Sequence, residues 1–127
     1  MKLDWEKVWN ESASVASVPF GAWLVEDIGG RGVVDTAQST IEFSADNTIS
    51  GNTCVNRFTG KFDFDGRIIE LGPLATTRRA GPPSLMDQES RFVAALAQIR
   101  RFRHDKSGLL ILFDADGNEL MRLSKIE

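Results

Sequence analysis

Side chains able to do covalent or acid–base chemistry are few in this chain, and none is spaced like a catalytic set. The sequence holds one histidine, His104, and one cysteine, Cys54. His104 stands among charged neighbours, so we expect a solvated imidazole rather than a general base. Cys54 has no base beside it, and a lone cysteine of this kind is usually a small buried apolar residue. With no G-x-S-x-G nucleophile elbow either, we expect that the protein is not an enzyme.

Two acidic segments resemble calcium-binding loops only superficially. Residues 63–66 and 114–117 each place two aspartates before a glycine. An EF-hand loop needs its glycine at the sixth position and a glutamate at the twelfth. Counted from Asp114, the glycine is fourth and the twelfth residue is Lys125. Hairpin turns explain both segments better, and no glycine-rich loop has the Walker spacing with its lysine, so we expect no metal and no cofactor.

Basic residues are concentrated between positions 78 and 106, where seven Lys and Arg residues face three Asp and Glu residues. One interpretation is a surface that contacts an anion, a phospholipid or a partner. Its candidate residues are Arg78, Arg79, Arg100 and Arg101. The other interpretation is that basic residues near the end of a helix complement the helix dipole. We favour the second, because a helix places these arginines on different faces.

The composition bounds the elements that position these residues. The chain has 127 residues and 14.0 kDa, which fits one compact domain. It is 42% hydrophobic and 26% charged, as is ordinary for a globular domain. A formal net charge of −3 gives no reason to expect nucleic acid as a partner. No apolar run approaches the roughly 20 residues of a transmembrane helix.

Short strands separated by turns dominate the sequence from Phe20 onward. Ile41 and Phe43 alternate with polar residues, as in a half-buried strand. Residues 65–66 and 114–118 are hairpin signals. We expect strands near residues 22–25, 40–44, 48–51, 58–64, 68–71, 109–113 and 119–123. This pattern predicts an antiparallel sheet or barrel.

One segment breaks the pattern and predicts a helix over residues 85–100. Its apolar residues share one helical face: Leu85, Phe92, Leu96 and Ile99. The last three should pack the helix against one open end or face of the barrel. Gln88 is expected on another face. Ser84 and Asp87 resemble a capping box, with Pro82 and Pro83 just outside the helix.

The two ends of the chain differ in character. Residues 1–18 are expected to form an N-terminal tail that packs one or two tryptophans onto a domain spanning residues 19–127. The first residues carry acids where a secretory signal needs an apolar stretch. The protein is therefore cytoplasmic if Met1 is its native start, or a signal has been removed; the sequence leaves both open.

Three segments carry a pattern shared with one known family. Residues 51–62, GNTCVNRFTGKF, resemble a G-x-x-G-C-N-x-x-x-G-x-Y stretch. Residues 75–82, ATTRRAGP, followed by Met86 and Glu89, resemble a T-x-M-A-C-P stretch and the m-x-x-E that comes after it. Residues 21–25, GAWLV, resemble a W-x-L first strand. In this ordered set the chain resembles the META domain, or HslJ-like, family of bacterial heat-inducible and envelope proteins.

The resemblance covers roughly residues 20–125 and implies a fold more than an activity. It implies a small antiparallel β-barrel, lipocalin-like in shape, with one helix. Members are associated with heat response, antibiotic tolerance, secretion or motility, and no catalytic activity is agreed. The motif residues are expected to be structural: Gly51, Asn56, Gly60, Thr77, Arg78, Pro82 and Glu89. Asn56 and Gly60 suggest a bulge or bend in a long strand, while Glu89 should accept from backbone N–H groups or pair with Arg78 or Arg79.

The chain departs from the family pattern at three positions. The family can carry one cysteine before the asparagine and one before the proline, where this chain has Val55 and Gly81. Cys54 falls where a glycine is usual. Joint loss of both cysteines fits a fold that does not use that crosslink, which mildly favours a reducing compartment or a variant core.

The sequence therefore predicts a monomeric, non-enzymatic META-domain protein that acts as a binding or accessory module in the cell envelope or the stress response. The alternative is a lipocalin-like carrier, because a barrel of this kind can enclose one small apolar ligand. An envelope protein or a small apolar ligand is the expected partner. Periplasm or cell envelope is the location implied by the resemblance.

Overall fold

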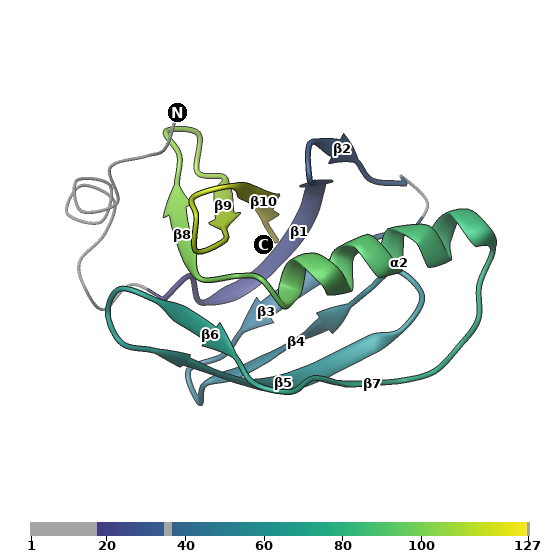
Figure 1. The fold of residues 1–127 in the computed structure, drawn as a ribbon, viewed down its shortest axis with the longest axis horizontal. Coiled ribbons are helices and arrows are strands. Elements are labelled where there is room, and N and C mark those ends of the chain that lie inside the picture. The colour runs from purple at the N-terminus through teal and green to yellow at the C-terminus, as the bar shows by residue number, and fades with distance from the viewer. Residues whose placement is uncertain (1–17, 35–36, 127) are drawn as a thin grey trace.

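The computed structural model describes residues 18–34 and 37–126, which form a mostly β fold with one helix (Figure 1). Its elements are β1 (Gly21–Ile28), β2 (Arg31–Gly32), β3 (Thr40–Phe43), β4 (Thr48–Asn52), β5 (Arg57–Phe64), β6 (Ile69–Leu71), β7 (Ala75–Thr76), α2 (Pro83–Leu96), β8 (Arg101–His104), β9 (Leu110–Phe113) and β10 (Glu119–Lys125). The expected tail, residues 1–18, lies outside the described residues except for Val18.

The strands form one antiparallel sheet that is nearly closed into a barrel. Its order is β6-β5-β4-β3-β1-β10-β9-β8, with β2 paired to β1 and β7 paired to β5. The two ends of this path meet where the Ile69 N–H, at the start of β6, donates to the Arg100 carbonyl at 2.8 Å, just before β8. The antiparallel barrel with one helix is thus confirmed. Among the described residues β7 pairs only with β5, so no strand joins β7 to the opposite edge of the sheet. Helix α2 lies over this part of the barrel (Figure 1).

Aspartates build the two hairpin turns that the sequence predicts. Asp65 Oδ1 accepts from the Arg67 and Ile68 N–H groups at 2.8 Å each between β5 and β6. Asp114 Oδ1 accepts from the N–H groups at positions 116 and 118 at 2.9 Å each between β9 and β10. Both hairpins are confirmed, and these carboxylates serve the turns themselves.

The stretch around His104 differs from the expectation of a solvated charged segment. Residues 101–104 form β8, in which Phe102 is buried and His104 is half-buried. The His104 ring lies 5.7 Å from the Trp23 ring, centroid to centroid. Burial, followed by the positive charge of Lys125, lowers the pKa of His104. The expectation was wrong because the arginines at positions 101 and 103 hide a strand-like alternation in a basic run.

Helix α2 begins earlier and ends earlier than the sequence predicts. Pro82 is its N-cap residue and Pro83 its first residue, so the prolines are part of the helix start. A proline is well placed there, because the first N–H groups of a helix have no partner within the helix. Ser84 makes no capping hydrogen bond, so the predicted capping box is wrong. The helix ends at Leu96 and not at residue 100, since the N–H groups of Gln98 and Ile99 bond only three residues back before β8 begins at Arg101.

The buried face of α2 packs into the barrel as expected. Phe92, Leu96 and Ile99 are each 0% exposed and belong to one hydrophobic cluster. Ile99 reaches that cluster from the turn after the helix. The Phe92 ring lies 5.6 Å from the Phe58 ring of β5. The helix is therefore part of the core that the strands enclose.

Gln88 was expected on another face of the helix, yet it is fully buried. Its Oε1 accepts from the Val34 N–H at 2.8 Å, and its Nε2 donates to the Ala37 carbonyl at 3.2 Å and to Ser39 Oγ at 3.1 Å. All of its buried polar atoms are thus paired. Gln88 joins α2 to the chain between β2 and β3.

Candidate functional site

The family-like motif residues gather at one place, around a tight turn between β4 and β5. The Thr53 N–H donates to the Asn56 carbonyl at 2.7 Å, which closes the turn. The Asn56 N–H in turn donates to Thr53 Oγ1 at 2.8 Å. Asn56 was expected within a bent strand, but it lies just before β5. The turn aims the Asn56 side chain away from β4 and toward the segment after β7.

The Asn56 side chain uses its full hydrogen-bonding capacity. Its Oδ1 accepts from Thr77 Oγ1 at 2.9 Å and from the Arg79 N–H at 2.6 Å. Its Nδ2 donates to the Arg79 carbonyl at 3.2 Å and to Glu89 Oε1 at 2.8 Å. A side-chain amide has two donors and two acceptor sites. Asn56 thereby holds both the segment after β7 and helix α2.

Glu89 connects the helix to the same turn. Its Oε1 accepts from Thr53 Oγ1 at 2.6 Å as well as from Asn56. No ion pair joins Glu89 to Arg78 or Arg79 among the residues that the structure describes. We call Thr53, Asn56, Thr77, Arg79 and Glu89 the Asn56 network. Thr53 was missed by sequence reasoning, since nothing in its neighbourhood marks a partner 36 positions away.

Two motif glycines permit close approach of the backbone. A Cβ at Gly51 would collide with the Thr40 carbonyl oxygen of β3. A Cβ at Gly60 would lie 2.6 Å from Leu74 Cδ2 and 2.9 Å from the Pro73 carbonyl oxygen. Side chains larger than hydrogen would have to displace main-chain atoms at both places. Gly51 thus permits the close approach of β3 to β4, and Gly60 permits that of the segment between β6 and β7 to β5.

Of the departures from the family pattern, Cys54 and Val55 are the central residues of this turn, and Gly81 lies against it. Cys54 has a φ of 94°, a conformation that glycine adopts without strain. Burial, followed by the negative charge of Glu89, raises the pKa of the Cys54 thiol. A Cβ at Gly81 would lie 3.4 and 3.5 Å from the two methyl carbons of Val55. The two positions where the family can carry cysteines therefore face each other in this chain.

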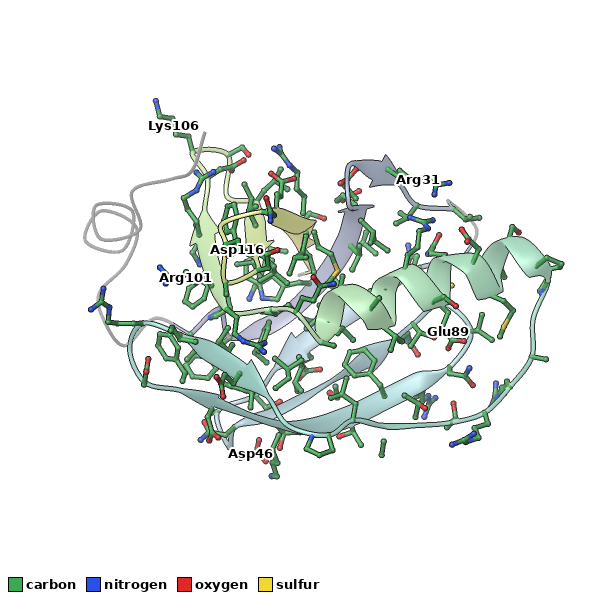
Figure 2. The ribbon with its side chains drawn as sticks, viewed as in Figure 1. Arg31, Asp46, Glu89, Arg101, Lys106 and Asp116 are labelled. Atoms are coloured by element: carbon green, nitrogen blue, oxygen red, sulfur yellow. The ribbon has the colours of Figure 1, made fainter. Side chains whose placement is uncertain are left out.

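A cleft of about 750 Å³ opens beside the Asn56 network, between the segment after β7 and helix α2. It is lined by Asn56, Thr76, Thr77, Arg78, Arg79, Ala80, Met86, Glu89, Ser90, Val93 and Ala94. Arg78 and Arg79 are exposed. Val93 is one of the few large apolar side chains that the described residues leave exposed, at 37%. Figure 2 shows Glu89 between the ribbon of α2 and that of β5. The cleft thus combines the positive charge of Arg78 and Arg79 with apolar side chains of α2, which stand beside Glu89 and Ser90.

The four candidate arginines do not form one patch. Arg78 and Arg79 line the cleft, whereas Arg101 opens β8, well apart from Glu89 (Figure 2). Arg100 Nη1 donates to the carbonyls of Ala97 and Ile99 at 3.3 and 2.8 Å. Ala97 is the C-cap of α2. Arg100 therefore satisfies carbonyls at the helix end, while Arg78 and Arg79 remain available to a ligand.

Among the described residues, no cluster of His, Cys, Asp and Glu is arranged to hold a metal ion. Nor does that part of the chain hold a helix long and apolar enough to cross a bilayer. The motif carboxylate and amide are engaged with each other. The cleft offers a ligand two guanidinium groups and the apolar side chains of Met86, Val93 and Ala94.

The fold and this network define a small antiparallel β-barrel closed by one helix, and comparisons with known proteins place it. The META domain family model matches residues 16–127. The chain belongs to the META domain family. No curated protein matches it in sequence.

Solved structures with the same fold are similar over most of their length. An NMR structure of a protein from Burkholderia xenovorans has a TM-score of 0.65 and 22% identity, with 91% of this chain and 95% of that chain covered. A crystal structure of a DUF4847 family protein from Bacteroides vulgatus has a TM-score of 0.61 and 18% identity, with 84% and 94% covered. At these identities the likeness concerns the fold.

Proposed function

We propose that this META-domain protein is a non-enzymatic binding or accessory module whose binding surface is the cleft between the segment after β7 and helix α2. The observation that carries the proposal is that some residues of the cleft are bonded to each other while others are exposed to a partner. Asn56 and Glu89 hydrogen-bond to each other, so they build the cleft wall. Arg78, Arg79 and Val93 line the same cleft and stay exposed. Exposed positive charge beside an exposed apolar side chain suits recognition of a partner.

The alternative, a carrier of a small apolar ligand inside the barrel, is less well supported. The buried apolar side chains of the described residues form one continuous cluster. Phe43 and Phe62 meet edge to face, with ring centroids 5.4 Å apart, in that cluster. Such packing in the interior favours a binding site on the surface. The envelope or stress-response setting rests on the family resemblance and indicates where a partner should be sought.

Site-specific photo-crosslinking in the cells that produce the protein tests the proposal. A benzoylphenylalanine placed at Val93, in the cleft, should give a discrete adduct. The same group at Lys106, in the exposed turn between β8 and β9, should not. Charge reversal at both Arg78 and Arg79 should abolish the Val93 adduct. Equal labelling from both positions, or none from Val93, would overturn the choice of surface.

The non-enzymatic part of the proposal has its own test. A panel of hydrolase and transferase substrates should show no turnover with the purified protein. Turnover that persists at constant specific activity through a second purification would overturn it.

A further inference from the structure

Strand β7 is the sheet edge that borders the cleft, and some of its main-chain N–H and C=O groups are not hydrogen-bonded to β5. Phe58 of β5 lies opposite Thr76 of β7. The next N–H along, that of Thr77, donates to the Arg57 carbonyl at 3.0 Å. In an antiparallel ladder, residues that exchange hydrogen bonds alternate with residues whose N–H and C=O point away from the partner strand. Thr76 therefore presents its N–H and C=O on the side opposite β5, and it is one of the residues that line the cleft.

The segment after β7 keeps the same alignment because Asn56 holds it as a strand would. Asn56 Oδ1 accepts from the Arg79 N–H at 2.6 Å, and Asn56 Nδ2 donates to the Arg79 carbonyl at 3.2 Å. With Thr77 and Arg79 both tied toward β5, the residue between them continues the alternation. Arg78 should thus offer its N–H and C=O to the open side, as Thr76 does. An exposed sheet edge with such free main-chain groups can take up an extended peptide as an added strand.

The other wall of the cleft supplies an apolar surface, and its rim supplies positive charge. Val93 is 37% exposed on α2, with Met86 and Ala94 beside it in the lining. Arg78 and Arg79 have no ion-pair partner among residues 18–34 and 37–126. An occupant that satisfies all three features needs a main chain, apolar side chains and acidic side chains.

We infer that the cleft binds an extended peptide segment that adds to the free edge of β7, with apolar side chains against α2 and acidic side chains at Arg78 and Arg79. This inference rests on the proposed function and names the partner class for that surface. A small anionic amphiphile would match the arginines and Val93 but leave the Thr76 main chain to water. A peptide strand uses all of these groups together, and main-chain pairing provides affinity while the side chains select the sequence.

Synthetic peptides test this inference directly. The probe is a fluorescein-labelled hexapeptide in which Val alternates with Glu, followed by fluorescence anisotropy with the full chain. A version with Lys for Glu should bind at least about tenfold more weakly. A version N-methylated at alternate residues, which loses main-chain donors on one edge, should also lose about tenfold. In the NMR spectrum the Thr76 and Arg78 amide signals should shift on binding.

Variants of the protein test whether Arg78 and Arg79 provide the positive charge that the peptide binds. Charge reversal at both Arg78 and Arg79 should weaken binding of the Glu peptide about tenfold, with unchanged thermal unfolding. The matched control is Arg31→Glu, at an exposed arginine of β2, which should leave binding unchanged.

Even where the Glu peptide binds, either of two results would overturn the strand-addition inference. One is an N-methylated peptide that binds as tightly as its parent. The other is decanoate that displaces the Glu peptide while the Thr76 amide signal stays unmoved, which would identify a site for small anionic amphiphiles. Val93 adducts in cells without peptide binding would defeat this inference alone, whereas absence of both would defeat the proposed function as well.

Discussion

The barrel interior and the Asn56 network are held by different physics, although helix α2 takes part in both. Phe92 and Leu96 enter the interior, where apolar burial is worth roughly 25 cal/mol per Å² and has no preferred direction. Glu89, one turn away, enters the network through two short hydrogen bonds. A net hydrogen bond contributes only about 0.5–1.5 kcal/mol, but an unpaired buried partner costs more. The interior therefore provides most of the stability of the fold, and the Asn56 network fixes the position of α2 relative to the segment after β7.

The largest effect is expected in the interior. Leu96→Ala should lower the free energy of unfolding by about 2–5 kcal/mol, because the side chain is fully buried and leaves a cavity. Val93→Ala, on the exposed face of the same helix, should change it by less than about 0.5 kcal/mol. Denaturant titration of both variants measures the difference. An unchanged midpoint for Leu96→Ala would mean that α2 does not cover the core.

A crosslink should strengthen the network side of the molecule. A Cβ at Gly81 would lie 3.4 Å from a methyl carbon of Val55, so we expect cysteines placed at both positions to form a disulfide. Closing that loop should raise stability by about 3 kcal/mol under oxidising conditions. Cys54→Ala is included in the parent and the variant, so that the neighbouring thiol does not compete. The same protein with reductant is the control, and equal unfolding midpoints in both states would show that the two positions are not held together.

The contrast between the two regions also explains what the sequence predicts. The interior face of α2 follows from helical periodicity, and Ile41 and Phe43 follow from strand alternation, because both patterns are local. β8 was missed because Arg101 and Arg103 make its alternation look like a solvated basic run. Phe102 is the only strongly apolar residue among the four of β8, so no second apolar residue two positions away reveals the strand period.

The network was only half predictable, for a different reason. The resemblance singled out Asn56 and Glu89, but not the bond between them, which spans 33 positions. Thr53 and the buried Gln88 carried no signal, since a polar residue becomes a buried partner only once the fold brings its counterpart close. Side-chain hydrogen bonds of long sequence separation are a product of the tertiary fold.

A smaller effect separates the hydrogen bonds of the network from its charge. Glu89→Ala should cost about 1–3 kcal/mol, because Thr53 Oγ1 and Asn56 Nδ2 lose their shared acceptor in a partly buried site. Glu89→Gln keeps a carbonyl oxygen that accepts from both, so it should cost less than Glu89→Ala. Chemical denaturation of the two variants at neutral pH measures the gap. If Glu89→Gln were as costly as Glu89→Ala, the carboxylate charge and not its hydrogen bonds would hold the network.

The smallest effect concerns the strain that the network tolerates at Cys54. Its φ of 94° is disfavoured for residues with a Cβ by about 1 kcal/mol or more. The Cys54 thiol also makes a stabilising contact, because it donates to the Leu85 carbonyl oxygen at 3.4 Å. Cys54→Ala removes that contact and keeps the strain, so it should be slightly less stable than the parent. Cys54→Gly removes both, and because glycine adopts positive φ freely it should exceed Cys54→Ala by about 1 kcal/mol. Comparing the two variants by thermal and denaturant unfolding isolates the backbone contribution from the thiol contribution. A glycine variant no more stable than the alanine variant would mean that the turn accommodates a side chain at this position without strain. The turn that holds Asn56 would then carry no backbone strain at Cys54.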